Sequence, residues 1–216
     1  MIGPAARIRR RSFAGIAVIA LVGCSSLFVS TPPGKLYRLS PAGNFPANLP
    51  RISAQLAIDV PQAPAGIDTS RIALSKSPFS LDYFADSEWA DRVPDLIQNL
   101  LLASFENSGA IIGVDRASGG LRADVILRTE IRHFEAVYAT ANGPPQVSVD
   151  IIARLVTVPG RTIVAETRFE QHSPAAANDI PSIVAAFDAA TDAVLRDIVV
   201  WTLGNPALSR AGRQLR

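Results

Sequence analysis

Cysteine and histidine, whose side chains often act as nucleophiles or metal ligands, are rare in this chain. The 216-residue sequence has one cysteine, Cys24, and two histidines, His133 and His172. Their spacing is not that of a metal site, and the sequence has neither a glycine-rich phosphate loop nor a nucleophile elbow. We therefore expect a protein that is not an enzyme and binds no metal. Cys24 remains the most informative reactive residue.

Three further features of the sequence could form functional sites. An acidic group near residue 86 could supply paired carboxylates, but loop residues and favourable charges at a helix N-terminus are the simpler interpretation. This group comprises Asp82, Asp86, Glu88 and Asp91. Trp89 is expected to pack its ring on the core with its N–H bonded, and a contact with a partner protein is the alternative. His133 is expected to face inward or to lie near a sheet edge.

The segment that precedes Cys24 has the organisation of an export signal. Four arginines between Arg7 and Arg11 form a basic region, and residues 13–22 form an apolar region. That region is shorter than the ~20 residues that span a bilayer. Leu21-Val22-Gly23-Cys24 resembles a bacterial lipobox. The resemblance implies cleavage between Gly23 and Cys24, a diacylglyceryl group on the thiol and an N-acyl chain, which together anchor a protein stably.

Alternatives to this interpretation remain open. They are a cleaved signal that ends at a cysteine by chance, and a short hydrophobic anchor. Arg10-Arg11-Ser12-Phe13 resembles a twin-arginine signal, although Sec export is the default expectation. Ser25-Ser26 resembles the sorting signal of enteric bacteria that favours the outer membrane over the inner membrane.

The charge and cysteine content exclude two classes of protein. The formal net charge is +2, and the four arginines near the N-terminus account for the excess of basic residues. The remaining chain is slightly acidic, which gives no support for nucleic-acid binding. With a single cysteine, the exported domain cannot form an internal disulfide.

Hydrophobic periodicity predicts one folded domain. Alternation predicts strands at residues 35–40, 55–60, 71–75, 80–84, 111–114, 123–138, 146–158 and 162–171. Val137 and Ile163 are expected to face the core. Helical spacing predicts a helix that begins near Val93 and stops at Gly109, and a second helix capped by Asp179. The outer face is expected to carry mixed charges, namely Arg128, Glu130, Arg132, Asp150, Arg154, Glu166, Arg168 and Glu170.

This order of elements predicts an α+β fold, with a mainly antiparallel sheet and two long amphipathic helices packed on one face. The expected organisation is a signal peptide (1–23), a lipidated cysteine with a flexible tether (24–34), the domain (35–204) and a disordered basic tail (205–216).

Several segments, taken in order, resemble the auxiliary lipoproteins of ABC-type transport systems, the PqiC/YmbA-like family. They are the lipobox at Cys24, Leu36 to Leu39, Leu56 to Pro61, Arg71 to Leu74, Leu81 to Asp91 and the closing helix. The most specific is Leu81 to Asp91, where a tyrosine-bearing strand leads into a Trp-Ala-acid segment. Phe84-Ala85-Asp86 departs from the family, in which further aromatic or basic residues are common there.

The resemblance implies a non-enzymatic, lipid-anchored protein that faces the periplasm. Its implied partners are an ABC permease, an ATPase and an MCE-domain protein that move lipid or other hydrophobic cargo between membranes. It implies no cofactor beyond the acyl chains on Cys24, and it leaves homo-oligomer formation open. The alternative hypothesis is an outer-membrane assembly lipoprotein that supports a β-barrel partner.

Overall fold

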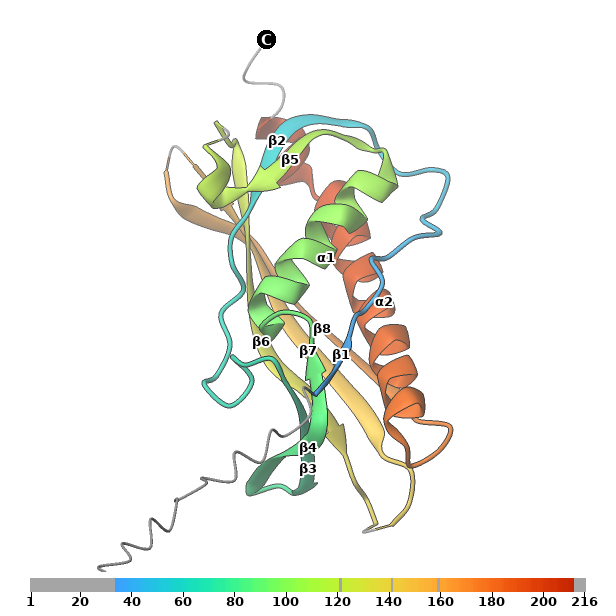
Figure 1. The fold of residues 1–216 in the computed structure, drawn as a ribbon. Coiled ribbons are helices and arrows are strands. Elements are labelled where there is room, and N and C mark those ends of the chain that lie inside the picture. The colour runs from blue at the N-terminus through green and yellow to red at the C-terminus, as the bar shows by residue number, and fades with distance from the viewer. Residues whose placement is uncertain (1–33, 121, 141, 159, 212–216) are drawn as a thin grey trace, which may run out of the picture. The chain divides into compact units, whose positions relative to one another are not determined.

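The computed structural model describes residues 34–120, 122–140, 142–158 and 160–211. Within these residues the chain forms one mixed eight-stranded sheet, three α-helices and a short 3₁₀ helix (Figure 1). In chain order they are β1 (Lys35–Tyr37), β2 (Ile52–Ile58), β3 (Arg71–Ser77), β4 (Ser80–Trp89), α1 (Val93–Ser108), β5 (Ile111–Arg116), η1 (Ala117–Gly119), β6 (Val125–Val137), β7 (Gln146–Thr157), β8 (Thr162–Pro174), α2 (Ile180–Gly204) and α3 (Pro206–Ala211).

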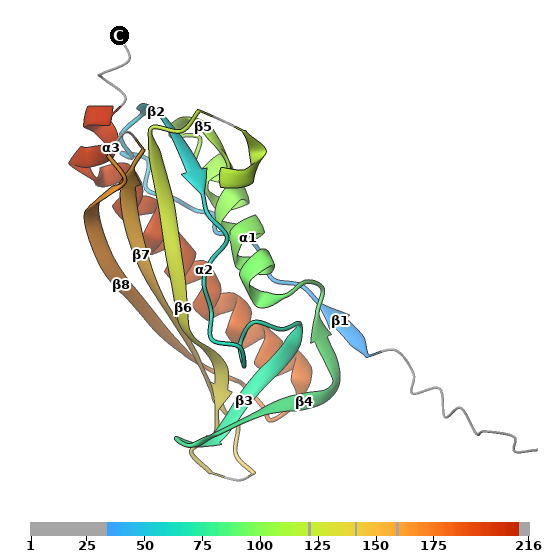
Figure 2. The same ribbon diagram turned by 90° about the vertical axis from the view of Figure 1, so that its left-hand side faces the viewer.

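Strand β6 is the centre of the sheet. One of its edges pairs with β7 along nearly the whole strand, and β7 pairs in turn with β8 (Figure 2). The other edge meets β2 near Val125 and β3 near Ala136, both in parallel. Between these two strands, Gln62 donates its N–H to the Thr129 carbonyl and accepts the Ile131 N–H. β2, Gln62 and β3 therefore lie one after another along the same edge of β6.

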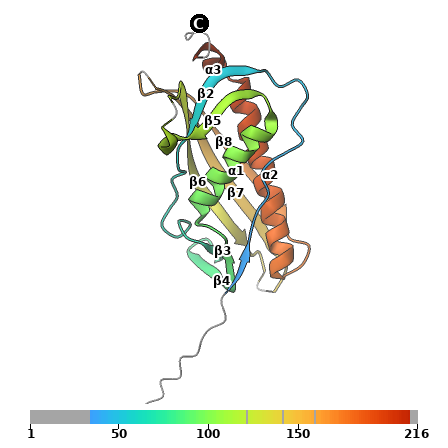
Figure 3. The ribbon, with the colours of Figure 1, turned by 45° about the horizontal axis from the view of Figure 1, so that its top comes forward.

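The outer strands attach to this arrangement on either side. β5 pairs with β2 in parallel, β4 pairs with β3 as an antiparallel hairpin, and β1 pairs with β4 in parallel. The hairpin β3–β4 lies at the same end as the loop after β6 and the start of α2, whereas β5 and α3 lie at the opposite end (Figures 1 and 3). The predicted α+β class is confirmed. The sheet is mixed: four of its strand pairings are parallel but short, and most of its paired residues belong to the antiparallel pairings, chiefly β6–β7 and β7–β8.

The helices begin and end where local signals predict. Pro94 lies in the first turn of α1, and Gly109 ends that helix at a φ of +58°, a conformation that favours glycine. Asp179 caps α2 by accepting the Ser182 N–H at 2.8 Å. Inside the core, the Gln98 amide of α1 donates to the Ile58 carbonyl at 3.0 Å, which ties α1 to the end of β2.

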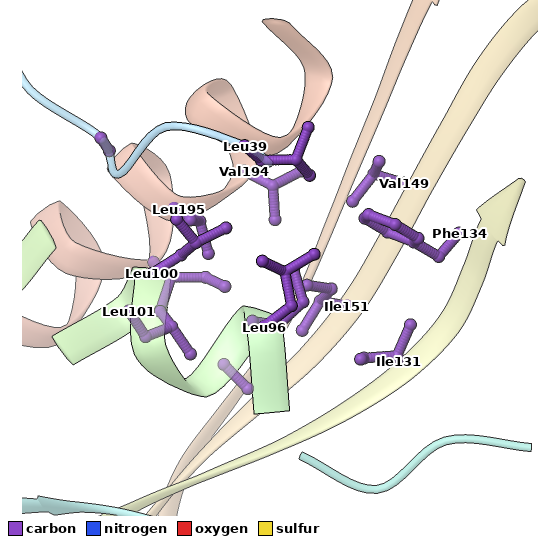
Figure 4. Close-up of a cluster of buried hydrophobic side chains, with 14 of the residues drawn as sticks. Leu39, Leu96, Leu100, Leu101, Ile131, Phe134, Val149, Ile151, Val194 and Leu195 are labelled. Atoms are coloured by element: carbon purple, nitrogen blue, oxygen red, sulfur yellow. The ribbon is translucent and has the colours of Figure 1, made fainter. Parts of the chain in front are cut away.

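Apolar side chains from both long helices and the central strands form one core. Leu96 and Leu100 of α1 converge with Val194 of α2 and Ile151 of β7 (Figure 4). α2 packs against β7 and β8, while α1 packs against β5 and α2. Leu39, from the segment after β1, enters the same cluster and is 8% exposed. Ala42, in the same segment, is held to α1 because its N–H donates to Ser104 Oγ at 2.8 Å.

Three aromatic rings join elements that are distant in sequence. Trp89 of β4 lies with its ring centroid 5.8 Å from Phe134 of β6 and 5.1 Å from Phe187 of α2. Phe134 and Phe187 are themselves 5.0 Å apart. All three side chains are at most 1% exposed, so this cluster fastens the β3–β4 hairpin to the central strand and to α2.

Two irregularities correct the predicted faces of the long strands. A register shift between Ile131 and His133 reverses the alternation in β6, so Phe134 and Ala136 turn inward and Val137 is 39% exposed. His133 likewise lies on the outer face instead of inward. A second shift in the β7–β8 pairing leaves Ile163 55% exposed. The predictions that Val137 and Ile163 face the core are therefore wrong.

The acidic segment also differs from its prediction. β4 extends through Trp89, so Asp82, Asp86 and Glu88 belong to a strand and not to a loop or a helix N-terminus. The acid in the first turn of α1 is Asp95. Asp86 takes a φ of +51°, a left-handed conformation that aspartate tolerates better than most residues.

The predicted disordered tail begins as a helix. Asn205 Oδ1 accepts the Ala207 N–H at 2.9 Å, and Pro206 opens α3. Leu208 is fully buried, and α3 packs near β2 (Figure 3). One buried leucine after a cap and a proline therefore orders a segment that its basic, polar composition suggested would be disordered. Residues 212–216 lie outside the described chain.

We predict that Phe187→Ala lowers the free energy of unfolding by about 3–5 kcal/mol, because it leaves a cavity between Trp89 and Phe134. Phe79→Ala is the matched control, since Phe79 is 98% exposed and its loss removes no packing. Urea denaturation followed by circular dichroism measures both. Similar losses in the two variants would contradict the role assigned to the aromatic cluster.

Candidate partner-binding surface

The outer face of β6, β7 and β8 carries charges that pair across the strands. Arg154 of β7 donates from Nη1 to Glu130 Oε2 at 3.0 Å and from Nε to Glu166 Oε2 at 2.5 Å. These hydrogen bonds, that of Glu166 first, raise the pKa of the Arg154 guanidinium above its ordinary value. The mixed-charge outer face predicted from alternation is therefore present, and its charges largely satisfy one another.

A second pair on this face contains a buried carboxylate. Asp150 of β7 is only 1% exposed and accepts the Arg168 Nε–H at 2.9 Å. The same hydrogen bond raises the pKa of Arg168. Burial of a carboxylate is costly unless it is paired, so Arg168 explains how Asp150 is tolerated at the middle of β7. We read this pair as a structural element of the sheet.

A hollow of about 830 Å³ lies between the β3–β4 hairpin and the outer face of β6. Its apolar wall includes Phe79, Leu81 and Val137, which are exposed. Its polar wall includes Lys76, Arg132, His133, Glu135, Tyr138 and Glu170. His133 Nδ1 lies 3.0 Å from Glu135 Oε1, so both groups have a partner on the wall.

The hairpin is held in place by the loop that connects β2 with β3. The Tyr83 hydroxyl donates to the Gly66 carbonyl at 2.9 Å, and the Arg71 guanidinium lies 3.5 Å from the centre of the Tyr83 ring. A Cβ at Gly66 would lie 2.5 Å from Leu81 Cδ2, so the loop approaches the hairpin closely where a side chain is lacking. These contacts position the apolar wall of the hollow.

Tyr138 joins the hollow to the N-terminal end of α2. Its hydroxyl donates to Asn178 Oδ1 at 2.7 Å, and its ring lies 6.5 Å from that of Phe84. Partial burial raises the pKa of the Tyr138 phenol above its ordinary value of 10.0, because desolvation disfavours the phenolate.

The residues singled out in the sequence are not brought together. Cys24 and Gly23 lie outside the described residues, so lipid attachment and cleavage there stay predictions. Trp89 is 1% exposed, and its indole N–H has no hydrogen-bond acceptor among the described residues. Its burial in the aromatic cluster favours the packing interpretation over the partner contact. Neither histidine joins the acids of β4 in a common site; His133 and His172 pair instead with Glu135 and Glu170.

The described part of the chain contains neither a membrane-spanning helix nor a cluster of metal-ligating side chains. None of its helices is long and apolar enough to cross a membrane. Across the same residues, no group of three or more His, Cys, Asp or Glu side chains is arranged to hold a metal ion. The exposed apolar tip at Phe79 was not predicted from the sequence. The predicted strands at 71–75 and 80–84 lie on either side of it and indicate a turn at this position.

The chain is similar to a family of transport proteins and to a bacterial relative. A family model described as an ABC-type transport auxiliary lipoprotein component matches residues 37–199. An uncharacterised protein of Bradyrhizobium diazoefficiens is 33% identical over 157 residues, which cover 70% of this chain. That relative is much longer, and the match spans only 40% of its length.

Solved structures share the fold. A crystal structure of a Xanthomonas campestris protein is 28% identical, has a TM-score of 0.75, and is matched over 84% of this chain and 98% of that chain. A second crystal structure, of an uncharacterised protein, has a TM-score of 0.58 at 14% identity and covers 74% of this chain and 97% of that chain. At that identity the second likeness concerns the fold alone.

We predict that Arg154→Ala lowers the free energy of unfolding by about 1 kcal/mol, since it removes the donor shared by half-buried Glu130 and exposed Glu166, and Arg132 remains as a partner of Glu130 alone. Arg128→Ala is the matched control, because Arg128 is directly opposite Arg154 in register and makes one exposed pair with Asp59. Its loss should cost at most about 0.5 kcal/mol. Urea denaturation at low and high salt tests this, and equal losses would contradict the assignment.

We also predict that alkaline pH destabilises the fold through Tyr138. Because the pKa of Tyr138 is raised in the folded state, the phenol of the unfolded chain ionises first as the pH rises above about 10. The contribution of Tyr138 to stability is therefore complete below that pH and is lost as the pH rises from there through the pKa of the folded state. Ultraviolet absorbance of tyrosinate should show one component above the ordinary tyrosine range in the native protein. Tyr138→Phe should remove that component. Its persistence in the variant would assign the shift to another tyrosine.

Proposed function

Because this chain belongs to the family of ABC-type transport auxiliary lipoproteins, we propose that it is a lipid-anchored accessory subunit of an ABC transporter in the bacterial envelope. The observation that carries this proposal is the order of its parts. The lipobox-like Leu21-Val22-Gly23-Cys24 stands shortly before residue 37, where the family match begins. The family is not an enzyme family, and we propose a role without catalysis for this chain.

We propose that the transported cargo is lipid or another hydrophobic molecule, and that the partners are a permease, an ATPase and an MCE-domain protein. Anchoring would keep the domain near such a complex, so that even a weak contact would be occupied through a high effective concentration. We further propose that both long helices cover one face of the sheet. The paired charges of Arg154 and Arg168 would then lie on the opposite, hydrated face.

The proposed anchor is a diacylglyceryl group on the Cys24 thiol with an N-acyl chain on its amino group. We place the protein on the periplasmic side, more readily at the outer membrane than the inner, because Ser25-Ser26 follows the cysteine. The acyl chains would be its only non-protein component. Self-association would be compatible with this arrangement.

We predict that cells fed an alkyne analogue of palmitate label the wild-type protein and not Cys24→Ala. Ser26→Ala is the control, since it keeps the proposed acceptor thiol and the residue after it. The readout is covalent label on the purified protein, because an uncleaved leader in Cys24→Ala could itself hold the chain at a membrane. Equal labelling of Cys24→Ala and the wild type would refute the lipid anchor.

Cells that express the wild type or Cys24→Ala also allow the proposed partners to be tested. A tagged wild-type chain, extracted from membranes in mild detergent, should co-purify a permease, an ATPase and an MCE-domain protein, and Cys24→Ala should recover less of them. Recovery of an outer-membrane β-barrel protein without any transporter subunit would instead support the alternative role in barrel assembly.

A further inference from the structure

The tip of the β3–β4 hairpin presents an aromatic side chain to solvent. Phe79 is 98% exposed, the largest exposed fraction among the described large apolar residues. Uncharged residues surround it in the sequence Ser77-Pro78-Phe79-Ser80-Leu81, and Leu81 is 38% exposed. Scattered surface apolar residues are normal, but a fully exposed phenylalanine at the end of a projecting hairpin requires a physical explanation.

The turn that carries Phe79 is closed by its own hydrogen bonds. Ser77 and Ser80 face one another in register, and their hydroxyl oxygens are 3.1 Å apart. The Phe79 N–H donates to Ser77 Oγ at 3.3 Å. The Tyr83 hydroxyl in turn holds β4 to the loop at Gly66. The fold therefore holds this apolar side chain outward, with no described residue covering it.

The described chain begins beside the strand that leads to this tip. β1 runs parallel to β4 with Lys35 opposite Ser87, and the start of β1 lies toward the hairpin end of the domain (Figure 1). Gly34 lies beside the backbone of Asp86. Asp86 and Ser80 are six positions apart on β4, a distance of at most about 20 Å. The ten Cα-to-Cα steps from Cys24 to Gly34 can reach at most about 35 Å, which exceeds that distance.

Two loops at this end of the domain carry no charge. The loop after β6 (139–146) and the segment that leads into α2 (173–178) contain no charged residue in the sequence. Both lie at the hairpin end, because Val137 pairs with Ser75 and the Ala175 N–H donates to the Pro145 carbonyl. Lys76 and Asp82, each three positions from Phe79, are the charged residues nearest the tip in sequence, and Arg132, Glu135 and Glu170 line the hollow beside it. A lysine beside an aromatic residue suits the interface of an anionic membrane.

From these observations we infer that Phe79 inserts into the lipid surface that holds the acyl chains of Cys24, and so orients the domain. The inference rests on the proposed lipid anchor. A lipid surface fits better than a protein groove, because the tether brings the tip within reach of the membrane and the surrounding loops present no charge to be desolvated. Insertion would hold the hairpin end at the membrane and direct β5, at the opposite end, away from it.

A fluorescent probe at position 79 tests this directly. If Cys24 is acylated, the mature protein has no free thiol, so Phe79→Cys supplies a single site for a thiol-reactive NBD dye. Ile112→Cys is the matched control, since Ile112 is 78% exposed on β5 at the opposite end. The labelled, acylated proteins are reconstituted in vesicles of phosphatidylethanolamine and phosphatidylglycerol.

We predict that the probe at position 79 gains emission and shifts to the blue, and that lipids carrying a nitroxide on the acyl chain quench it. The probe at position 112 should show neither effect. An unshifted probe at position 79 would overturn the inference, as would equal changes at both positions. A blue shift without nitroxide quenching would mean contact with another protein or a second copy, and would also overturn it.

The wild-type protein separates this inference from the proposal on which it rests. Dye uptake by wild type would show a free Cys24 thiol, and the lipid anchor itself would then fail. Absence of uptake, together with an unshifted probe at position 79, would leave the anchor standing and refute insertion alone. Urea denaturation of Phe79→Cys should match wild type, because the side chain makes no contact in the core.

Discussion

The hydrogen bonds along the edges of β6 are the constraint on which the rest of the fold depends. β7 fills one edge, and β2, Gln62 and β3 fill the other in sequence, since neither seven-residue strand could cover thirteen residues. A buried backbone group left unpaired there would cost about 1–3 kcal/mol. β6 therefore sets the positions of two separate strand groups, and the rings of Trp89, Phe134 and Phe187 fasten the second of them to α2.

Elements that depend on local chemistry could be predicted from the sequence. Pro94, Gly109 and Asp179 act within one helical turn, so they mark helix boundaries without knowledge of the tertiary structure. The parallel pairings could not be predicted in this way, because they join segments far apart in the chain. The register shift between Ile131 and His133 could not be predicted either, because one extra residue in β6 can be recognised only from its pairing with β7.

The pattern at Cys24 and the exposed tip at Phe79 also differ in whether they depend on the tertiary structure. The lipobox-like pattern at Cys24 is linear, and its interpretation as a lipid-attachment site needs only the residues that precede it. The exposure of Phe79 and the hollow beside it depend on the close approach of Gly66 to Leu81 and on the Tyr83 hydrogen bond. The sequence predicts strands on either side of Phe79, but whether another element covers the tip is decided by the tertiary fold.

The charges of the outer face also bear on where a partner would bind. Arg154 is shared by two carboxylates, and Arg168 pairs with Asp150 and Glu170, so these groups neutralise one another within the sheet. A charged ligand that bound there would have to break existing pairs before it gained new ones. The exposed apolar residues at the two ends, Phe79 and Ile112, impose no such cost. Contacts at the ends of the domain are therefore favoured over contacts on its charged face.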